Sequence, residues 1–165
     1  MAQRDKFSTV KLEGSLLTHD LLKQIISNEA SDILPDSYGL PPGDKINEAI
    51  SRDWDKALKF WQSFQNSLDQ MSSDDPATTV TRERWLLPLF SLLGYGRLQL
   101  ARGMQAQSTV YSISHRFSAT PIHMLGCRIK LDQRTSGQKG AARMSPHSLV
   151  QDFLNKDDQC LWGIV

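Results

Sequence analysis

The stretch that decides the fold runs from Thr109 to Leu131 and reads TVYSISHRFSATPIHMLGCRIKL. Its first part alternates apolar and polar side chains, which is typical of a half-buried strand. The second part alternates in the same way from Pro121 onward. The face of each part that should be buried carries Tyr111, Ile113, His115 and Phe117 in the first and His123, Leu125, Cys127, Ile129 and Leu131 in the second. Because only a short turn separates them, we expect an antiparallel pair of strands.

Helical spacing of apolar residues precedes this pair of strands. It predicts a short helix capped by Thr18, a long helix from Asp44 to Met71, and a helix capped by Thr81 that Pro88 should kink. The long helix carries Trp54, Trp61 and Phe64 on one face. Core packing explains such a stripe better than base stacking, because the aromatic residues lie on the face that the helical period buries.

A further helix and strand are expected after the strand pair. Ser145 and Pro146 are typical of a helix start, and apolar residues at helical spacing follow them. The final residues, LWGIV at 161–165, have the composition of a buried strand. A chain that stops inside such a strand leads us to expect the front of a longer protein.

This order of elements predicts an α/β fold, with α+β as the neighbouring possibility, and a small, incomplete sheet. The polar, proline-bearing segment before Thr81 predicts a division into two parts. The first is a helical N-terminal part, residues 1–75. The second is an α/β core, residues 81–165.

Charge is unevenly distributed although the net charge is only +1. Residues 1–83 hold nine Lys and Arg against 14 Asp and Glu, a net of −5. Residues 84–143 hold nine against one, a net of +8, and the remaining residues have a net of −2. A block this basic suits a polyanion such as DNA, unless acidic neighbours neutralise it in the fold.

Six cations of this block are the predicted phosphate-contacting residues. Three of them lie in the glycine-rich, polar segment 132–143, which should be an exposed loop. The other three lie on the predicted strands. The full set is Arg116, Arg128, Lys130, Arg134, Lys139 and Arg143.

From Arg84 onward the order of helices and strands is that of the nuclease core of many restriction enzymes. By that pattern an Asp should end the first strand and a Glu-x-Lys should lie on the next, to hold Mg²⁺ and orient the attacking water. There is no Asp or Glu between Arg84 and Leu131, and His115 and the triplet Arg128 to Lys130 take these places. We therefore expect a degenerate nuclease-like core without a metal site or catalytic residues.

Other chemistry has weaker support in the sequence. His115, His123, Cys127 and Cys160 have zinc-ligand types, but their spacing matches no ligand template, and core packing explains them better. We expect the two cysteines to be reduced core residues. The segment GYGRLQ lacks the Lys and Ser or Thr of a phosphate-binding loop.

Several stretches together carry a family resemblance: LPPGDKINEAISRDW, TRERWLLPLFSLLGYGRL, YSISHRF, PIHMLGCRIKLDQRT, GAARMSPHSLVQDFLN and LWGIV. In combination, from about Leu12 to Val165, they resemble the amino-terminal region of large single-chain adenine-specific DNA methyltransferases of type IIG-like restriction-modification and anti-phage defence systems. The chain lacks the Asn-Pro-Pro-Tyr motif and the glycine-rich strand end of that family. The resemblance therefore implies no methyl transfer and no S-adenosylmethionine site here, only in the parent protein.

The predicted function is a DNA-binding or scaffolding module of such a methyltransferase. Its partners would be DNA and the methyltransferase domain of its own longer chain. The N-terminus MAQRDKFSTVKLEG lacks a signal segment, and no apolar run is long enough to span a membrane, so the expected location is the cytoplasm.

Two alternatives remain open. The first is a protein–protein interaction or structural fragment without DNA affinity, which self-associates through the C-terminal strand. The second is a live Mg²⁺-dependent nuclease.

Overall fold

A computed structural model describes residues 18–27 and 34–165. The chain divides into two compact units, Met1–Arg52 and Asp53–Val165. It has an α/β fold with a helical N-terminal part and a small incomplete sheet, as the sequence predicts. The predicted lack of a signal segment concerns residues 1–14, which lie outside the described residues. Of the helices described, none has the length and apolar character needed to cross a membrane.

The first unit contains α1 (His19–Ile26), the 3₁₀ helix η1 (Pro35–Tyr38) and the beginning of α2 (Ile46–Asp69). Thr18 caps α1 as predicted, because its side chain accepts a hydrogen bond from the backbone N–H of Leu21. The sequence predicts that α2 starts at Asp44, but it starts two residues later, at Ile46. The carboxylate of Asp44 accepts a hydrogen bond from Arg52 at 3.0 Å.

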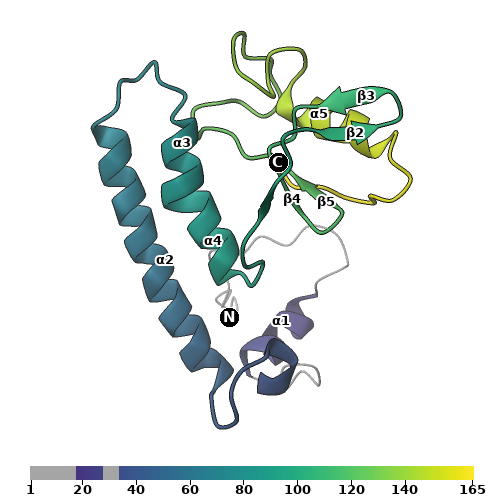
Figure 1. The fold of residues 1–165 in the computed structure, drawn as a ribbon. Helices are drawn as coiled ribbons and strands as arrows, with labels where there is room; N and C mark the ends of the chain where they lie inside the picture. Colours follow the sequence, from purple (N-terminus) through teal and green to yellow (C-terminus); the bar gives the residue numbers. More distant parts are fainter. Residues whose placement is uncertain (1–17, 28–33) are drawn as a thin grey trace, which may run out of the picture. The chain divides into compact units, whose positions relative to one another are not determined.

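The second unit begins inside α2, whereas the sequence predicts a division near residues 75–81. The reason for the difference is packing between helices. Trp61 and Phe64 of α2 contact Trp85 with ring centroids 4.9 and 6.5 Å apart, so this part of α2 and the next helical segment lie side by side (Figure 1).

Phe64 is buried as predicted, but Trp54 is 63% exposed and Trp61 38% exposed. Core packing therefore accounts for only one side of the aromatic stripe.

The helical segment around Pro88 comprises α3 (Thr78–Val80), a π-helical stretch, η2 (Thr81–Leu86), and α4 (Leu87–Leu92). The π-helical stretch ends two residues before Pro88, whose missing N–H removes one backbone hydrogen bond from the helix, and the kink at Pro88 stays a prediction. Thr81 was predicted to be the N-cap, which is wrong. It lies inside the helix, is buried, and accepts a hydrogen bond from the backbone N–H of Cys127 through its hydroxyl.

The strands form two small antiparallel sheets. One contains β1 (Gln99–Leu100), β4 (His115–Phe117) and β5 (Thr120–Ile122) in the order β1-β4-β5. The other is a ribbon of β2 (Met104–Ala106) and β3 (Thr109–Tyr111). The predicted antiparallel pairing is confirmed between β4 and β5, where His115 is opposite Ile122.

The predicted first strand is divided between the two sheets. The N–H of Ile113 donates to the carbonyl of Tyr111 at 2.8 Å, a tight turn that ends β3. The predicted alternation of burial nevertheless holds through this break. Tyr111, Ile113 and His115 are buried, whereas Val110 and Arg116 are exposed. Phe117, expected on the buried face, is 41% exposed.

The prediction of a second strand is wrong beyond Ile122. The N–H of Met124 bonds to the hydroxyl of Ser114 and the N–H of Cys127 to that of Thr81, so side chains replace a neighbouring strand as acceptors. Leu131 is exposed, and Cys127, which was expected in the core, is exposed as well.

The last helix, α5 (Pro146–Leu154), starts at Ser145 as predicted, because the Ser145 hydroxyl accepts a hydrogen bond from the N–H of Ser148. Its Leu149, Val150 and Phe153 pack with Tyr111 and Ile113 in one core cluster.

Of the C-terminal strand predicted after α5, only Ile164 pairs with the sheet, in parallel with Ile122. Leu161 is 93% exposed and Trp162 is 53% exposed, so the expectation of a buried run is wrong for them.

Gly126 marks a close approach between two distant parts of the second unit. A Cβ there would overlap the carbonyl group of Pro76 and lie 2.9 Å from the backbone nitrogen of Thr78. We expect Gly126→Ala to lower the free energy of unfolding by roughly 1–3 kcal/mol or more, because backbone rather than a flexible side chain must move. Chemical denaturation of the purified variant measures this.

Gly137→Ala is the matched control for this prediction. No atom lies within 4 Å of a Cβ at that position, and only its φ of 77° opposes a side chain. Its cost should stay near 1 kcal/mol, the ordinary left-handed penalty. Equal losses in the two variants would contradict the close-approach explanation.

Candidate nucleic-acid interface

The segment between β5 and α5 contains a loop that is closed by its own backbone. The N–H of Thr135 donates to the carbonyl of Ala141 at 2.8 Å, and the N–H of Ala141 donates to that of Gln138 at 3.0 Å. The carbonyl of Leu131 accepts a hydrogen bond from the N–H of His147 in the first turn of α5. These bonds hold both ends of the loop, which the sequence predicts to be exposed but not to be closed by its own hydrogen bonds.

His123 anchors this loop to the core. Its Nε2 lies 3.0 Å from the carbonyl oxygen of Gly140, so Nε2 carries the proton and donates it. Gly140 has a φ of 83°, and a Cβ there would lie 2.6 Å from the same ring nitrogen. Only glycine satisfies both the backbone conformation and this approach, so the imidazole fixes the loop position.

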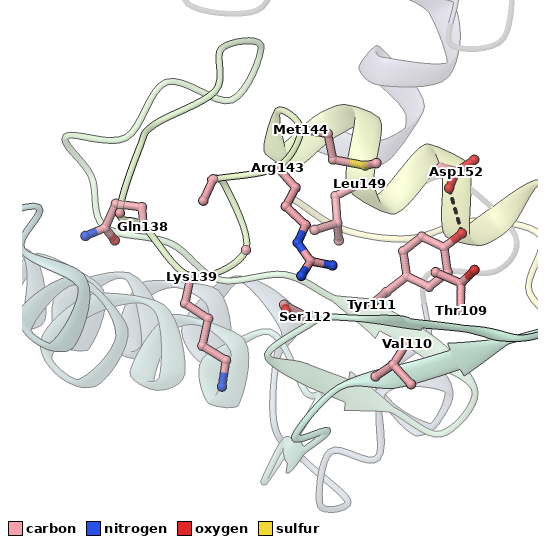
Figure 2. Close-up of a pocket in the computed structure, with 13 residues that line it drawn as sticks. Thr109, Val110, Tyr111, Ser112, Gln138, Lys139, Arg143, Met144, Leu149 and Asp152 are labelled. Atoms are coloured by element: carbon pink, nitrogen blue, oxygen red, sulfur yellow. Dashed lines mark hydrogen bonds between the residues drawn. The ribbon is translucent and has the colours of Figure 1, made fainter.

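A pocket of about 460 Å³ lies between this loop, β3 and α5. Figure 2 shows Arg143 extending into the space above Ser112 and Tyr111, while Met144 and Leu149 border it from the α5 side. Lys139 lies on the loop at the other side of the pocket. The pocket therefore combines apolar surface with two cations at its margin.

The structure brings three of the six predicted phosphate contacts onto this one loop: Arg134, Lys139 and Arg143. All three side chains are exposed, and within residues 18–27 and 34–165 no hydrogen-bond or ion-pair partner is found for them. The one acidic residue of the basic block, Asp132, pairs with His147 at 2.8 Å instead. These cations are available to an external anion.

The other three predicted residues lie elsewhere. Arg116 is exposed on β4, opposite Gln99 and Pro121. Lys130 is exposed just before the loop.

Arg128 has internal partners. Its guanidinium donates to the backbone carbonyls of Ser72, Asp75 and Leu68, the last two at 2.9 and 3.4 Å. These bonds tie the end of α2 and the following turn to the segment after β5. An internal structural role thus accounts for Arg128, and its phosphate contact stays a prediction.

A polar cluster that the sequence did not reveal lies beside the pocket. The hydroxyl of Tyr111 donates to Oδ2 of Asp152 at 2.6 Å, and Nζ of Lys156 donates to the same oxygen at 2.8 Å. The hydrogen bonds from Lys156 and Tyr111 lower the pKa of Asp152, and the bond to Asp152 raises the pKa of Lys156. The i,i+4 spacing of Asp152 and Lys156 is the feature of the sequence that indicates their ion pair. The hydrogen bond from Tyr111 arises only in the tertiary structure.

Two histidines that were predicted to lie in the core are indeed buried. His115 Nδ1 lies 3.0 Å from the Ser114 hydroxyl, and Nδ1 of His123 has no hydrogen-bond partner among the described residues. Burial lowers the pKa of both imidazoles; at His115 the charge of Arg82 and repulsion from His123 when that ring is protonated lower it further, and at His123 the bond to Gly140 opposes the effect of burial. The lowered pKa favours the neutral form of both rings, as expected for buried imidazoles.

Within the described ranges, no three His, Cys, Asp or Glu side chains are grouped to hold a metal ion. Both cysteines are free thiols, and burial raises the pKa of Cys160 to about 11. Comparison of the chain with protein-family models, with curated proteins and with solved structures found no match.

The buried histidines predict a pH-dependent stability. Their pKa values lie below 6.5 in the folded protein, so the unfolded chain binds protons first as the pH falls. The free energy of unfolding should therefore decrease from pH 6.5 downward, by at most about 1.4 kcal/mol per pH unit for each histidine. Urea denaturation at a series of pH values between about 7.5 and 5 measures this slope.

His123→Gln tests which group is responsible. A glutamine amide can still donate to the Gly140 carbonyl but does not titrate, so the slope should become shallower while stability at pH 7.5 changes less. An unchanged slope in this variant would assign the pH dependence to other groups.

Proposed function

We propose that this protein is a DNA-contacting module that binds phosphates through the loop bearing Arg134, Lys139 and Arg143. The observation that carries the proposal is the presence of three exposed cations without internal partners on one anchored loop. Arginine and lysine neutralise phosphates and release counterions from DNA, which drives binding without sequence recognition. Anchoring by His123 lowers the entropy lost when the loop binds.

Arg116 and Lys130 extend this surface in the proposal, since both are exposed and Lys130 directly precedes the loop. Arg128 is the weakest member of the set because its guanidinium already binds three carbonyls.

In the wider proposal the module belongs to an adenine-specific DNA methyltransferase of restriction-modification or phage defence and acts in the cytoplasm. The support for this is the sequence resemblance. The methyltransferase domain of the same longer chain would be its partner, and S-adenosylmethionine would bind there. The module itself would contribute DNA affinity or scaffolding and no catalysis.

A second candidate function is self-association through the C-terminal segment. The exposure of Leu161 and Trp162 beside the parallel bridge at Ile164 favours it. Sedimentation velocity over a range of protein concentrations distinguishes the two candidates, since concentration-dependent dimers without DNA affinity would favour self-association.

The first test of DNA binding is fluorescence anisotropy of a labelled duplex. With three to five phosphate contacts, the affinity should fall by roughly 40- to 500-fold between about 50 and 200 mM salt. Changing Arg134, Lys139 and Arg143 to Ala should weaken binding and flatten this salt dependence.

A matched control changes Lys45, Lys56 and Lys59 to Ala, which removes the same charge from exposed positions on and next to α2. This control should bind DNA nearly as the unmodified protein does. Equal losses in both triple variants would mean that net charge alone attracts DNA, and no binding at about 50 mM salt would refute the proposal.

A further inference from the structure

We infer that the pocket between β3, the anchored loop and α5 binds a single nucleotide whose base is adenine or cytosine, which carry an amino group where thymine has a carbonyl. This inference rests on the proposed contact between the loop and DNA, and it goes beyond a contact with phosphates alone. The nucleotide could be a free monophosphate or an unpaired nucleotide of a DNA strand. Both present the same chemistry to the pocket.

The size and composition of the pocket fit such a ligand. Its volume of about 460 Å³ lies within the range of small-molecule sites. Side chains of Ala142, Met144 and Leu149 give it an apolar wall that suits the flat face of a base. Duplex DNA presents its bases stacked and paired, so a base reaches such a wall only from an unpaired position.

Arg143 is the cation placed to bind the phosphate. It extends into the pocket, whereas the side chain of Lys139, a second cation of the lining, is directed away from it in Figure 2. Neither has an internal partner among the described residues, so a phosphate would gain charge-assisted hydrogen bonds without breaking existing ones.

The carboxylate of Asp152 supplies the base selectivity. Tyr111 and Lys156 both donate to its Oδ2, and these two bonds fix the carboxylate. Oδ1 has no such donor within the described residues, and Asp152 is one of the residues that line the pocket. A carboxylate oxygen accepts a hydrogen bond from the amino group of adenine or cytosine, whereas thymine presents a carbonyl at the corresponding edge.

The walls are already formed without a ligand. The loop is closed by the Thr135–Ala141 and Ala141–Gln138 bonds and is held by His123. The opposite wall is β3, which pairs with β2 along its other edge. Such preorganisation reduces the entropy cost of binding a small ligand.

Isothermal titration with dAMP, dCMP, dTMP and inorganic phosphate tests the inference. We expect dAMP and dCMP to bind about tenfold more tightly than dTMP, which matches the loss of one hydrogen bond to a charged group. Inorganic phosphate should bind more weakly than either. Equal binding of all four ligands, or no binding of any nucleotide, would overturn the inference.

Asp152→Asn is the decisive variant for the base contact. The asparagine oxygen can still accept from Tyr111, while its amide can donate to a carbonyl in the pocket. The preference should shift from dAMP toward dTMP, with unchanged affinity for inorganic phosphate. A merely structural role of Asp152 would weaken all ligands together.

Two further variants separate this inference from the proposed function. Ala142→Phe and Thr109→Phe should fill the pocket without changing charge, and Thr109 is an exposed strand position that tolerates an aromatic residue. Either variant that retains the native unfolding transition should lose dAMP binding and keep its salt-dependent duplex affinity. If the unmodified protein binds duplex DNA but no nucleotide, only the nucleotide inference fails; if it binds neither, both fail.

A comparison of oligonucleotides identifies the source of the nucleotide. A duplex with one unpaired adenine should bind more tightly than the same duplex fully paired if the ligand is part of DNA, and Ala142→Phe should abolish the difference. If dAMP binds but the two duplexes bind equally, the pocket takes a free nucleotide.

Discussion

The second unit depends on one constraint: the hydrogen bonds of the buried segment Pro121–Gly126 must be satisfied by partners from several distant parts of the chain. All six residues are buried. A buried backbone group without a partner is costly, and this segment has a regular strand partner only at its start. β4, Ser114 and Ile164 therefore meet around it and supply the partners, and Thr81 accepts a hydrogen bond from Cys127, the next residue along the chain.

The same segment positions the candidate site. His123 follows β5 directly, so the register of β5 against β4 determines where its imidazole meets Gly140. The loop with the unpartnered cations is thereby tied to the sheet, although its own residues are polar and glycine-rich. Its three cations have no ion-pair partner among the described residues, and Asp132 and Asp152 pair with His147 and Lys156 instead.

Local features that were predicted from residue types agree with the structure, and long-range ones often do not. The caps of α1 and α5 follow from Thr18 and Ser145, because a cap needs only a side chain and the next turn. The predicted strand after Ile122 fails because hydroxyl groups of Ser114 and Thr81, 10 and 46 residues away from their donors, take the place of a neighbouring strand. The extent of the buried face of α2 was also overestimated. The spacing of apolar residues shows which face of a helix is apolar, but not how much of that face a neighbouring element covers.

The sequence by itself determined the α/β class, the caps of α1 and α5, the pairing of β4 with β5, and the basic segment that bears Arg134, Lys139 and Arg143. Each of these follows from periodicity, capping or composition over a short stretch. Only the tertiary structure decided that Arg128 binds carbonyl groups at the end of α2, that His123 holds Gly140, and that Tyr111 joins Asp152 and Lys156 beside a pocket. These depend on contacts between residues far apart in the chain. Residue types leave many such pairings possible, and packing together with the need to satisfy buried polar groups selects among them.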